Sequence, residues 1–243
     1  MAERISPREE RAIVYEWLSS LFIAPLSAAQ IAAYRSGAGA ELLAALGEEP
    51  SLAPGIAAIR HALEAFPAEA RAGITLNHAY VSLFLGAGGP ETVPPYESVY
   101  GSEFARVCQE PMVRMEALLR RLGLRVGADC REPADHLAIE LAAQAALLRR
   151  LDRADSEADR CDSRELLCSM LGWIPDFATL CQKLDRTGFY AGAAAVLAAF
   201  LAAEYAERDV TDHPDSSKER VDDDASSRRA PELTAFAAPL PSE

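Results

Sequence analysis

Three side chains in this sequence could together perform hydrolytic chemistry: Ser98, Asp135 and His136. A serine nucleophile needs a histidine base in contact with it and an acid that orients the histidine. Asp135 and His136 are adjacent, however, and adjacent residues of a helix point about 100° apart. Ser98 also lacks the Gly-x-Ser-x-Gly surroundings of a nucleophile elbow. A small hydrolase or nucleotidase built on these residues is therefore an alternative reading, and we do not expect an enzyme.

Metal and nucleotide sites have less support from residue spacing. His61, His78 and His136 are far apart, and the five cysteines show no Cys-x-x-Cys spacing, so neither a zinc site nor a disulfide framework is expected. The glycines within residues 86–89 are not followed by Lys-Ser or Lys-Thr, as a Walker A loop would be. We expect no metal, no cofactor and reduced thiols.

Two stretches must position the candidate side chains, and the first is the loop from Leu83 to Gly101. It carries three glycines and then Pro94-Pro95. Prolines favour extended backbone, whereas glycines adopt conformations that other residues resist, so the loop is expected to have a defined shape. Ser98 is well placed to cap a following helix, which the apolar spacing predicts over Tyr100 to Leu122.

The second stretch is Glu132-Pro133-Ala134-Asp135-His136, which precedes an apolar run to Leu151. Proline is favoured at the first position of a helix, and acidic side chains are favourable near a helix N-terminus. These preferences predict a helix that starts at Pro133. They make Asp135 an acid of its first turn and leave His136 bonded to a neighbouring carbonyl.

Apolar residues recur at helical spacing along most of the remaining chain. They predict helices over residues 8–22, 28–34, 41–46, 52–66, 67–84, 164–177 and 187–207. Pro175 should kink or divide one of them, and the polar stretch 152–165 reads as a solvated connection. No strand alternation of useful length occurs. The predicted fold class is all-α, with one helical-bundle domain of roughly nine to eleven helices over residues 1–208, followed by a disordered acidic tail over residues 209–243.

The charge balance points to a basic partner. The chain has 24 Lys and Arg against 37 Asp and Glu, a net charge of −13, and residues 1–208 alone carry −8. Such an acidic body disfavours nucleic acid. The N-terminus lacks the apolar region of a signal peptide, which predicts a cytoplasmic protein. The alanine-rich run between Arg186 and Glu204 predicts a buried helix, with no stable membrane insertion.

Three motifs follow one another in the chain: Tyr80-Val81-Ser82-Leu83-Phe84-Leu85-Gly86, then Pro94-Pro95-Tyr96-Glu97-Ser98-Val99-Tyr100, then Glu132-Pro133-Ala134-Asp135-His136-Leu137-Ala138-Ile139-Glu140-Leu141. With Trp173-Ile174-Pro175-Asp176-Phe177 and Thr187-Gly188-Phe189-Tyr190, they resemble the TorD/DmsD family of cytoplasmic molybdoenzyme-maturation chaperones. The resemblance spans roughly residues 8 to 207. Many relatives carry tryptophan where this chain has Tyr96.

The resemblance implies an all-α fold and a task that is not enzymatic. The implied client is a molybdoenzyme of the DMSO reductase type, bound through its apo-form catalytic subunit or its twin-arginine signal peptide until molybdopterin is inserted and export is allowed. For the protein itself we expect a monomer or homodimer. A general helical adaptor is the remaining alternative. By motif match, the client- or leader-binding candidates are Pro94, Tyr96, Ser98, Tyr100, Pro133, Asp135 and His136.

Overall fold

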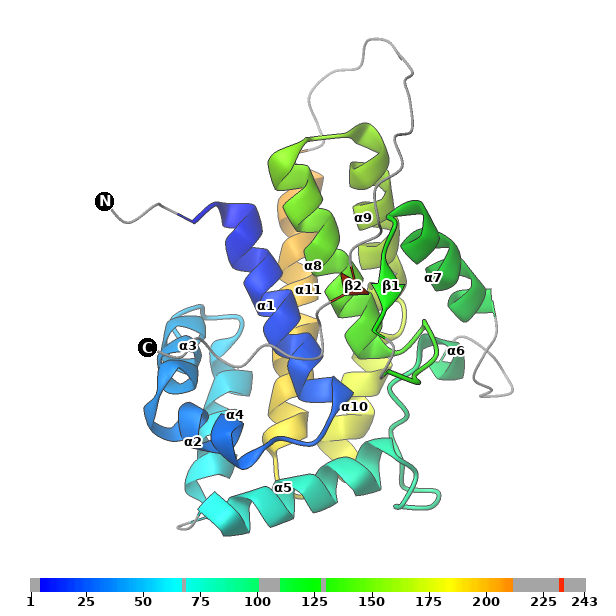
Figure 1. The fold of residues 1–243 in the computed structure, drawn as a ribbon. Helices are drawn as coiled ribbons and strands as arrows, with labels where there is room; N and C mark the ends of the chain where they lie inside the picture. The colour runs from blue at the N-terminus through cyan, green and yellow to red at the C-terminus, as the bar shows by residue number, and fades with distance from the viewer. Residues whose placement is uncertain (1–4, 67–68, 101–109, 128–129, 212–231, 234–243) are drawn as a thin grey trace.

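The described part of the chain is almost entirely helical (Figure 1). The computed structural model describes residues 5–66, 69–100, 110–127, 130–211 and 232–233. The all-α prediction is confirmed, and the number of helices in these residues lies within the expected range. The helices are α1 Pro7–Ile23, α2 Ala28–Ser36, α3 Ala38–Leu46, α4 Ala53–Glu64, α5 Glu69–Phe84, α6 Glu97–Tyr100, α7 Glu110–Arg121, α8 Leu137–Arg153, α9 Glu157–Leu171, α10 Ile174–Leu184 and α11 Phe189–Thr211.

A two-stranded parallel sheet accompanies the helices. Strand β1, Arg125–Val126, pairs with β2, Glu232–Leu233. β2 belongs to the stretch for which the sequence predicts disorder, and residues 212–231 and 234–243 of that stretch lie outside the described residues. Residues 101–109 of the helix predicted over 100–122 also lie outside them, with α6 before and α7 after.

The junction between α8 and α9 differs from the sequence prediction of a solvated connection over residues 152–165. α8 continues to Arg153, and α9 begins at Glu157 after an N-cap at Ser156. The Ser156 hydroxyl accepts the backbone N–H of Asp159 at 3.1 Å, and Arg150 pairs with Asp159 at 3.1 Å. The polar residues are helical because a serine cap and ion pairs satisfy them at the helix surface.

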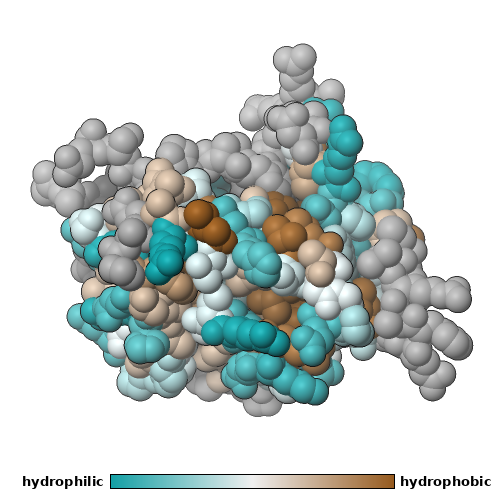
Figure 2. All heavy atoms as spheres, turned by 90° about the horizontal axis from the view of Figure 1, so that it is seen from below, coloured by the Kyte–Doolittle hydropathy of each residue, from teal (hydrophilic) through white to brown (hydrophobic). Residues whose placement is uncertain are grey.

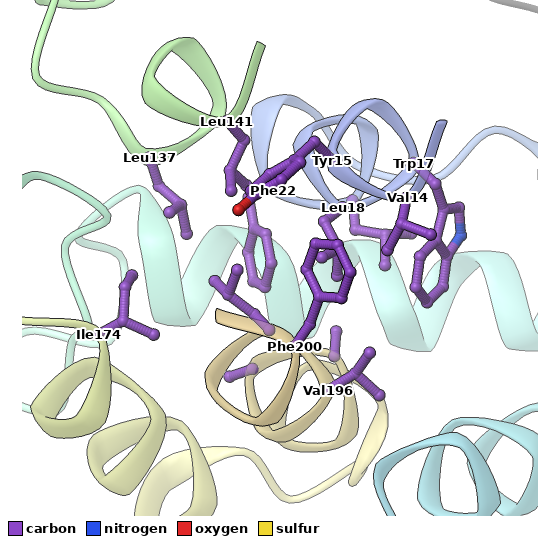
Figure 3. Packing of buried hydrophobic residues seen from close by; sticks show 14 of the residues in the cluster. Val14, Tyr15, Trp17, Leu18, Phe22, Leu137, Leu141, Ile174, Val196 and Phe200 are labelled. Atoms are coloured by element: carbon purple, nitrogen blue, oxygen red, sulfur yellow. The ribbon is translucent and has the colours of Figure 1, made fainter. Parts of the chain in front are cut away.

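Helix α1 packs against both α8 and α11, and the core lies between them (Figures 1 and 3). Phe22 from α1, Leu141 from α8 and Phe200 from α11 point into one apolar cluster (Figure 3). The Ser19 hydroxyl also donates to the Ala138 carbonyl at 2.7 Å, which joins α1 to the start of α8. Six aromatic side chains at helical spacing are buried in the protein: Trp17, Phe22, Tyr80, Phe84, Trp173 and Phe177.

Helix α11 confirms the expectation of a buried, alanine-rich helix. By length and composition it could cross a membrane, with a hydropathy of 1.5 over Phe189–Glu207, but 56% of that window is buried inside the protein. A core helix of a water-soluble bundle meets the same composition test. Pro175 likewise acts as expected, because α9 ends at Leu171 and α10 starts at Ile174 with the proline in its first turn.

The crossing of α4 and α11 depends on two glycines. A Cβ atom on Gly55 would lie 2.8 Å from the Gly192 carbonyl oxygen, and one on Gly192 would lie 2.8 Å from the Gly55 carbonyl oxygen. The two backbones therefore touch at this crossing. No larger residue fits at either position without moving a helix.

We expect Gly55→Ala to lower the free energy of unfolding by about 1–3 kcal/mol, because the new methyl group overpacks this contact. Denaturant unfolding measures the change. Gly73→Ala is the matched control, since its Cβ would meet only Ile31 at 3.6 Å and alanine is favoured in a helix interior by about 0.5–1 kcal/mol. Equal effects of the two substitutions would contradict the packing argument.

Candidate functional site

The loop between α5 and α6 has a defined shape, as predicted. Gly86 and Gly89 have φ values of 80° and 63°, in the left-handed region that favours glycine. A Cβ on Gly88 would lie 2.7 Å from the Ser82 carbonyl oxygen. The backbone N–H of Val93 donates to the Leu83 carbonyl at 2.7 Å, and the Val93 side chain is fully buried. These contacts close the glycine turn and direct the two prolines toward α8.

The loop then pairs with the segment that precedes α8. Tyr96 and His136 form an isolated antiparallel bridge. On either side of it, the Glu97 N–H donates to the Asp135 carbonyl at 3.1 Å and the Leu137 N–H donates to the Pro95 carbonyl at 2.8 Å. Two stretches about 40 residues apart in the sequence thus form one site.

The start of α8 is four residues later than the sequence predicted. Pro133 is not its first residue and Asp135 is not an acid of its first turn, because α8 begins at Leu137. The physical reason is the pairing with the loop, which holds the backbone of His136 extended. Ala134 and Asp135 before it form a turn that the His136 N–H closes on the Pro133 carbonyl at 3.0 Å. His136 is the N-cap, and its Nδ1 accepts the Ala138 N–H at 3.1 Å. The expected bond from His136 to a carbonyl is therefore replaced by a cap of the helix.

Asp135 stabilises the neighbouring helix α6. Its Oδ2 atom accepts the backbone N–H of Ser98 at 3.2 Å and a short hydrogen bond from the Ser98 hydroxyl. Ser98 was predicted to be an N-cap, but it lies inside α6, Glu97–Tyr100, so that prediction is wrong. The carboxylate that caps α6 comes instead from Asp135, in the segment that precedes α8. A carboxylate that accepts helix N–H groups is favourable at this end of a helix.

The geometry does not assemble a hydrolytic triad. Burial lowers the pKa of His136 to about 4, against the opposing effect of Glu132 and Asp135, so the ring is neutral near pH 7. A neutral imidazole has one N–H, and since Nδ1 accepts from Ala138, the proton is on Nε2. The ring then has no free lone pair for the Ser98 proton, which is donated to Asp135 instead.

The seven predicted site residues are together in space but differ in exposure. Ser98, Asp135 and His136 are at most 2% exposed, whereas the side chains that remain half-buried are Pro94, Tyr96, Tyr100 and Pro133. The Tyr96 ring meets the His136 ring edge to face at 5.1 Å. Its hydroxyl donates to Glu132 at 2.6 Å. Burial raises the pKa of Tyr96 well above its ordinary value, so this hydroxyl stays a donor.

Tyr100 extends the site toward the last part of the bundle. Its ring stacks on the Trp173 indole at 5.2 Å with an interplanar angle of 27°. It also meets Phe177 edge to face at 6.3 Å. The C-terminal motif around Trp173 therefore lies beside the loop motif, a contact that residue spacing alone did not reveal.

Sequence reasoning missed an acidic group beneath α6. Arg114 of α7 pairs with both carboxylate oxygens of Glu97, the longer distance being 2.6 Å, and the Ser169 hydroxyl donates to Glu97 at 2.6 Å. Glu140 of α8 lies below them with no exposed surface. Burial, and then the neighbouring Glu97, raise the pKa of Glu140 well above its ordinary value. A glutamate within the apolar run of α8 was the one sequence signal for this group.

The raised pKa of Glu140 makes stability depend on pH. Between the ordinary pKa of 4.5 and the raised one, the folded chain binds more protons than the unfolded chain, so stability falls as pH rises. Glu140→Gln removes this titration and keeps a hydrogen-bond donor. We expect its stability relative to the native chain to increase from pH 5 to pH 8, by at most about 1.4 kcal/mol per pH unit.

Denaturant unfolding at pH 5, 6, 7 and 8 provides the measurement. Glu116→Gln, at an exposed glutamate of α7, is the control and should follow the native chain at every pH. Parallel curves for Glu140→Gln and the native chain would show that Glu140 is not held protonated.

Comparisons with known proteins identify the family of the chain. The family described as "Nitrate reductase delta subunit" matches residues 49–179. The chain is 36% identical over 199 residues to the chaperone protein TorD of Ferrimonas balearica, covering 82% of this chain and 90% of the relative. It is 32% identical over 197 residues to TorD of Vibrio parahaemolyticus, covering 79% and 91%. The chain therefore belongs to the nitrate reductase delta subunit family, the family of the TorD chaperones, as its ordered motifs predicted.

Proposed function

We propose that this TorD-like chaperone of molybdoenzyme maturation recognises its client through the twin-arginine signal peptide and holds the apo-form of the catalytic subunit while molybdopterin is inserted. The client is a molybdoenzyme of the DMSO reductase type. Membership in a chaperone family confirms that the chain is not an enzyme, and chaperones of this family work in the cytoplasm. The chaperone itself carries no cofactor in this proposal, and it acts as a monomer or homodimer.

The observation that carries the proposal is the meeting of the two motifs at one site. The half-buried side chains of Pro94, Tyr96, Tyr100 and Pro133 are available to touch a peptide. Asp135 and His136 are buried and hold the backbone beneath them, so they position the contact residues. A rigid, prearranged surface lowers the entropy lost when a flexible leader binds.

The charge and apolar character of the protein suit a leader that has two arginines followed by an apolar segment. The chain carries a net charge of −13, which attracts a cationic peptide. Ile74 and Val81 of helix α5 and Leu85 just after its end are exposed apolar side chains that lead to the start of the loop. Figure 2, seen from below, shows apolar side chains among hydrophilic ones on this side of the molecule. The apolar half of the leader has a counterpart there.

Calorimetry with a synthetic twin-arginine leader peptide of the client tests the proposal. We expect Tyr96→Ala to weaken binding by about tenfold, equivalent to about 1.4 kcal/mol, because it removes a half-buried aromatic contact. Tyr205→Ala, at an exposed tyrosine of α11, is the matched control and should leave the affinity unchanged. Tyr96 is a sharper test than Asp135, whose removal would also release α6.

The opposing outcomes are distinct. If neither the leader nor the apo-enzyme binds the native chain, the proposed function is wrong. If the client co-purifies equally with and without its leader, the protein is a general adaptor and leader recognition is wrong.

A further inference from the structure

A single arginine covers a buried group of acids at the base of α6. Arg114 donates to both oxygens of Glu97, and Ser169 completes the contact. Behind Glu97 lies Glu140, with no exposed surface, close enough to interact with both Glu97 and Arg114. Asp135 adds a third carboxyl group and is likewise fully buried.

The acids offer more acceptor capacity than the described residues use. Glu140 is held protonated and hydrogen-bonds Glu97, whereas Oδ1 of Asp135 accepts no hydrogen bond within the part of the chain that the structure describes. Buried polar oxygens in folded proteins almost always have partners, because leaving them unsatisfied is costly. The guanidinium of Arg114 bonds directly to Glu97 and also reaches Glu110 at 3.5 Å, so Glu97 is the paired acid at the centre of the group.

Arg114 is the member of the cluster that faces solvent. Its side chain is 31% exposed, whereas that of Glu97 is 11% exposed. Beside it, α7 and α9 form a small groove with an apolar floor and a rim of two arginines and two acids. The groove is lined by Arg114, Met115, Leu118, Arg121, Asp162, Glu165 and Leu166. The open space in the groove is only about 10 Å³, so a guanidinium reaches Glu97 only when the Arg114 side chain moves aside.

We propose that the Glu97–Glu140 pair is the subsite for a leader arginine and that Arg114 is an internal ligand, which the client's guanidinium replaces. This inference rests on the proposed function and specifies which side chains would bind the leader arginine. Replacing one guanidinium with another keeps the buried acids paired, so the exchange avoids the penalty of an uncompensated buried charge. The planar fork of arginine matches two carboxylate oxygens, whereas the ammonium of lysine does not.

The first experiment asks whether the subsite accepts a free guanidinium, without any client. Arg114→Ala should lower the melting temperature, and N-methylguanidinium chloride at millimolar concentration should raise it again. Arg121→Ala is the matched control, because Arg121 is on the same helix and pairs with Asp162 at an exposed site. The inference is overturned if the additive does not raise the melting temperature of Arg114→Ala, or if it raises that of Arg121→Ala equally.

The second experiment measures displacement with the leader peptide. Removing the internal competitor should tighten binding of the twin-arginine leader by roughly tenfold, since no fraction of the subsite is then occupied by Arg114. A leader with Lys-Lys in place of Arg-Arg should gain much less, and Glu97→Gln should bind the native leader more weakly. Unchanged or weaker leader binding by the Arg114 variant would overturn the displacement.

A second variant covers the case of misfolding, and one combination of results separates the guanidinium subsite from the proposed function. If Arg114→Ala does not fold, Arg114→Lys keeps a cation over the acids but loses the fork, and it should also bind the leader more tightly than the native chain. If N-methylguanidinium stabilises Arg114→Ala while the native chain binds no leader, the guanidinium subsite is upheld and the proposed function is wrong.

Discussion

The carboxylate of Asp135 accepts two hydrogen bonds from Ser98, and the backbone beside it pairs with the proline loop. This contact joins the end of the loop after α5 to the start of α8, two parts of the chain about 40 residues apart in the sequence. Because Asp135 is fully buried, an unpaired carboxylate there would be unfavourable, and the geometry of the loop is therefore tightly specified. The position of α6 and of the half-buried side chains around Tyr96 follows from it.

The same end of the bundle holds a surplus of buried acid. Glu97 is compensated by Arg114, whereas Glu140 is held protonated by burial and by its neighbour. A glutamate at the solvent-exposed surface would not stay protonated at neutral pH, since a solvated glutamate ionises near its ordinary pKa. Buried acids such as Glu97 and Glu140, covered by the single arginine Arg114, suit a protein whose proposed ligand is cationic.

The rest of the fold provides a rigid support for this end. α1 and α8 pack along their length, and α11 meets α4 at a glycine contact where the two backbones touch. Aromatic rings from α1, α5, α10 and α11 meet edge to face below the loop, Phe22, Phe84, Phe177 and Tyr190 among them. The shape of the site is thus maintained by close packing that leaves the loop few alternative positions.

Much of the fold could be predicted from the sequence, because helices are encoded by local periodicity, prolines and caps: the apolar stripe of α1 and the division at Pro175 are examples. The ordered motifs also determined the family. The site could not be predicted to the same depth, since whether Asp135 caps its own helix or a neighbouring one depends on backbone pairing 40 residues away. Only the tertiary structure decided that α8 starts at Leu137, that His136 is a cap without a free lone pair, and that Arg114 covers Glu97. The physical reason is that local spacing specifies which face of a helix is buried, whereas the partners of a buried polar group are specified by the chain segments that fold against it.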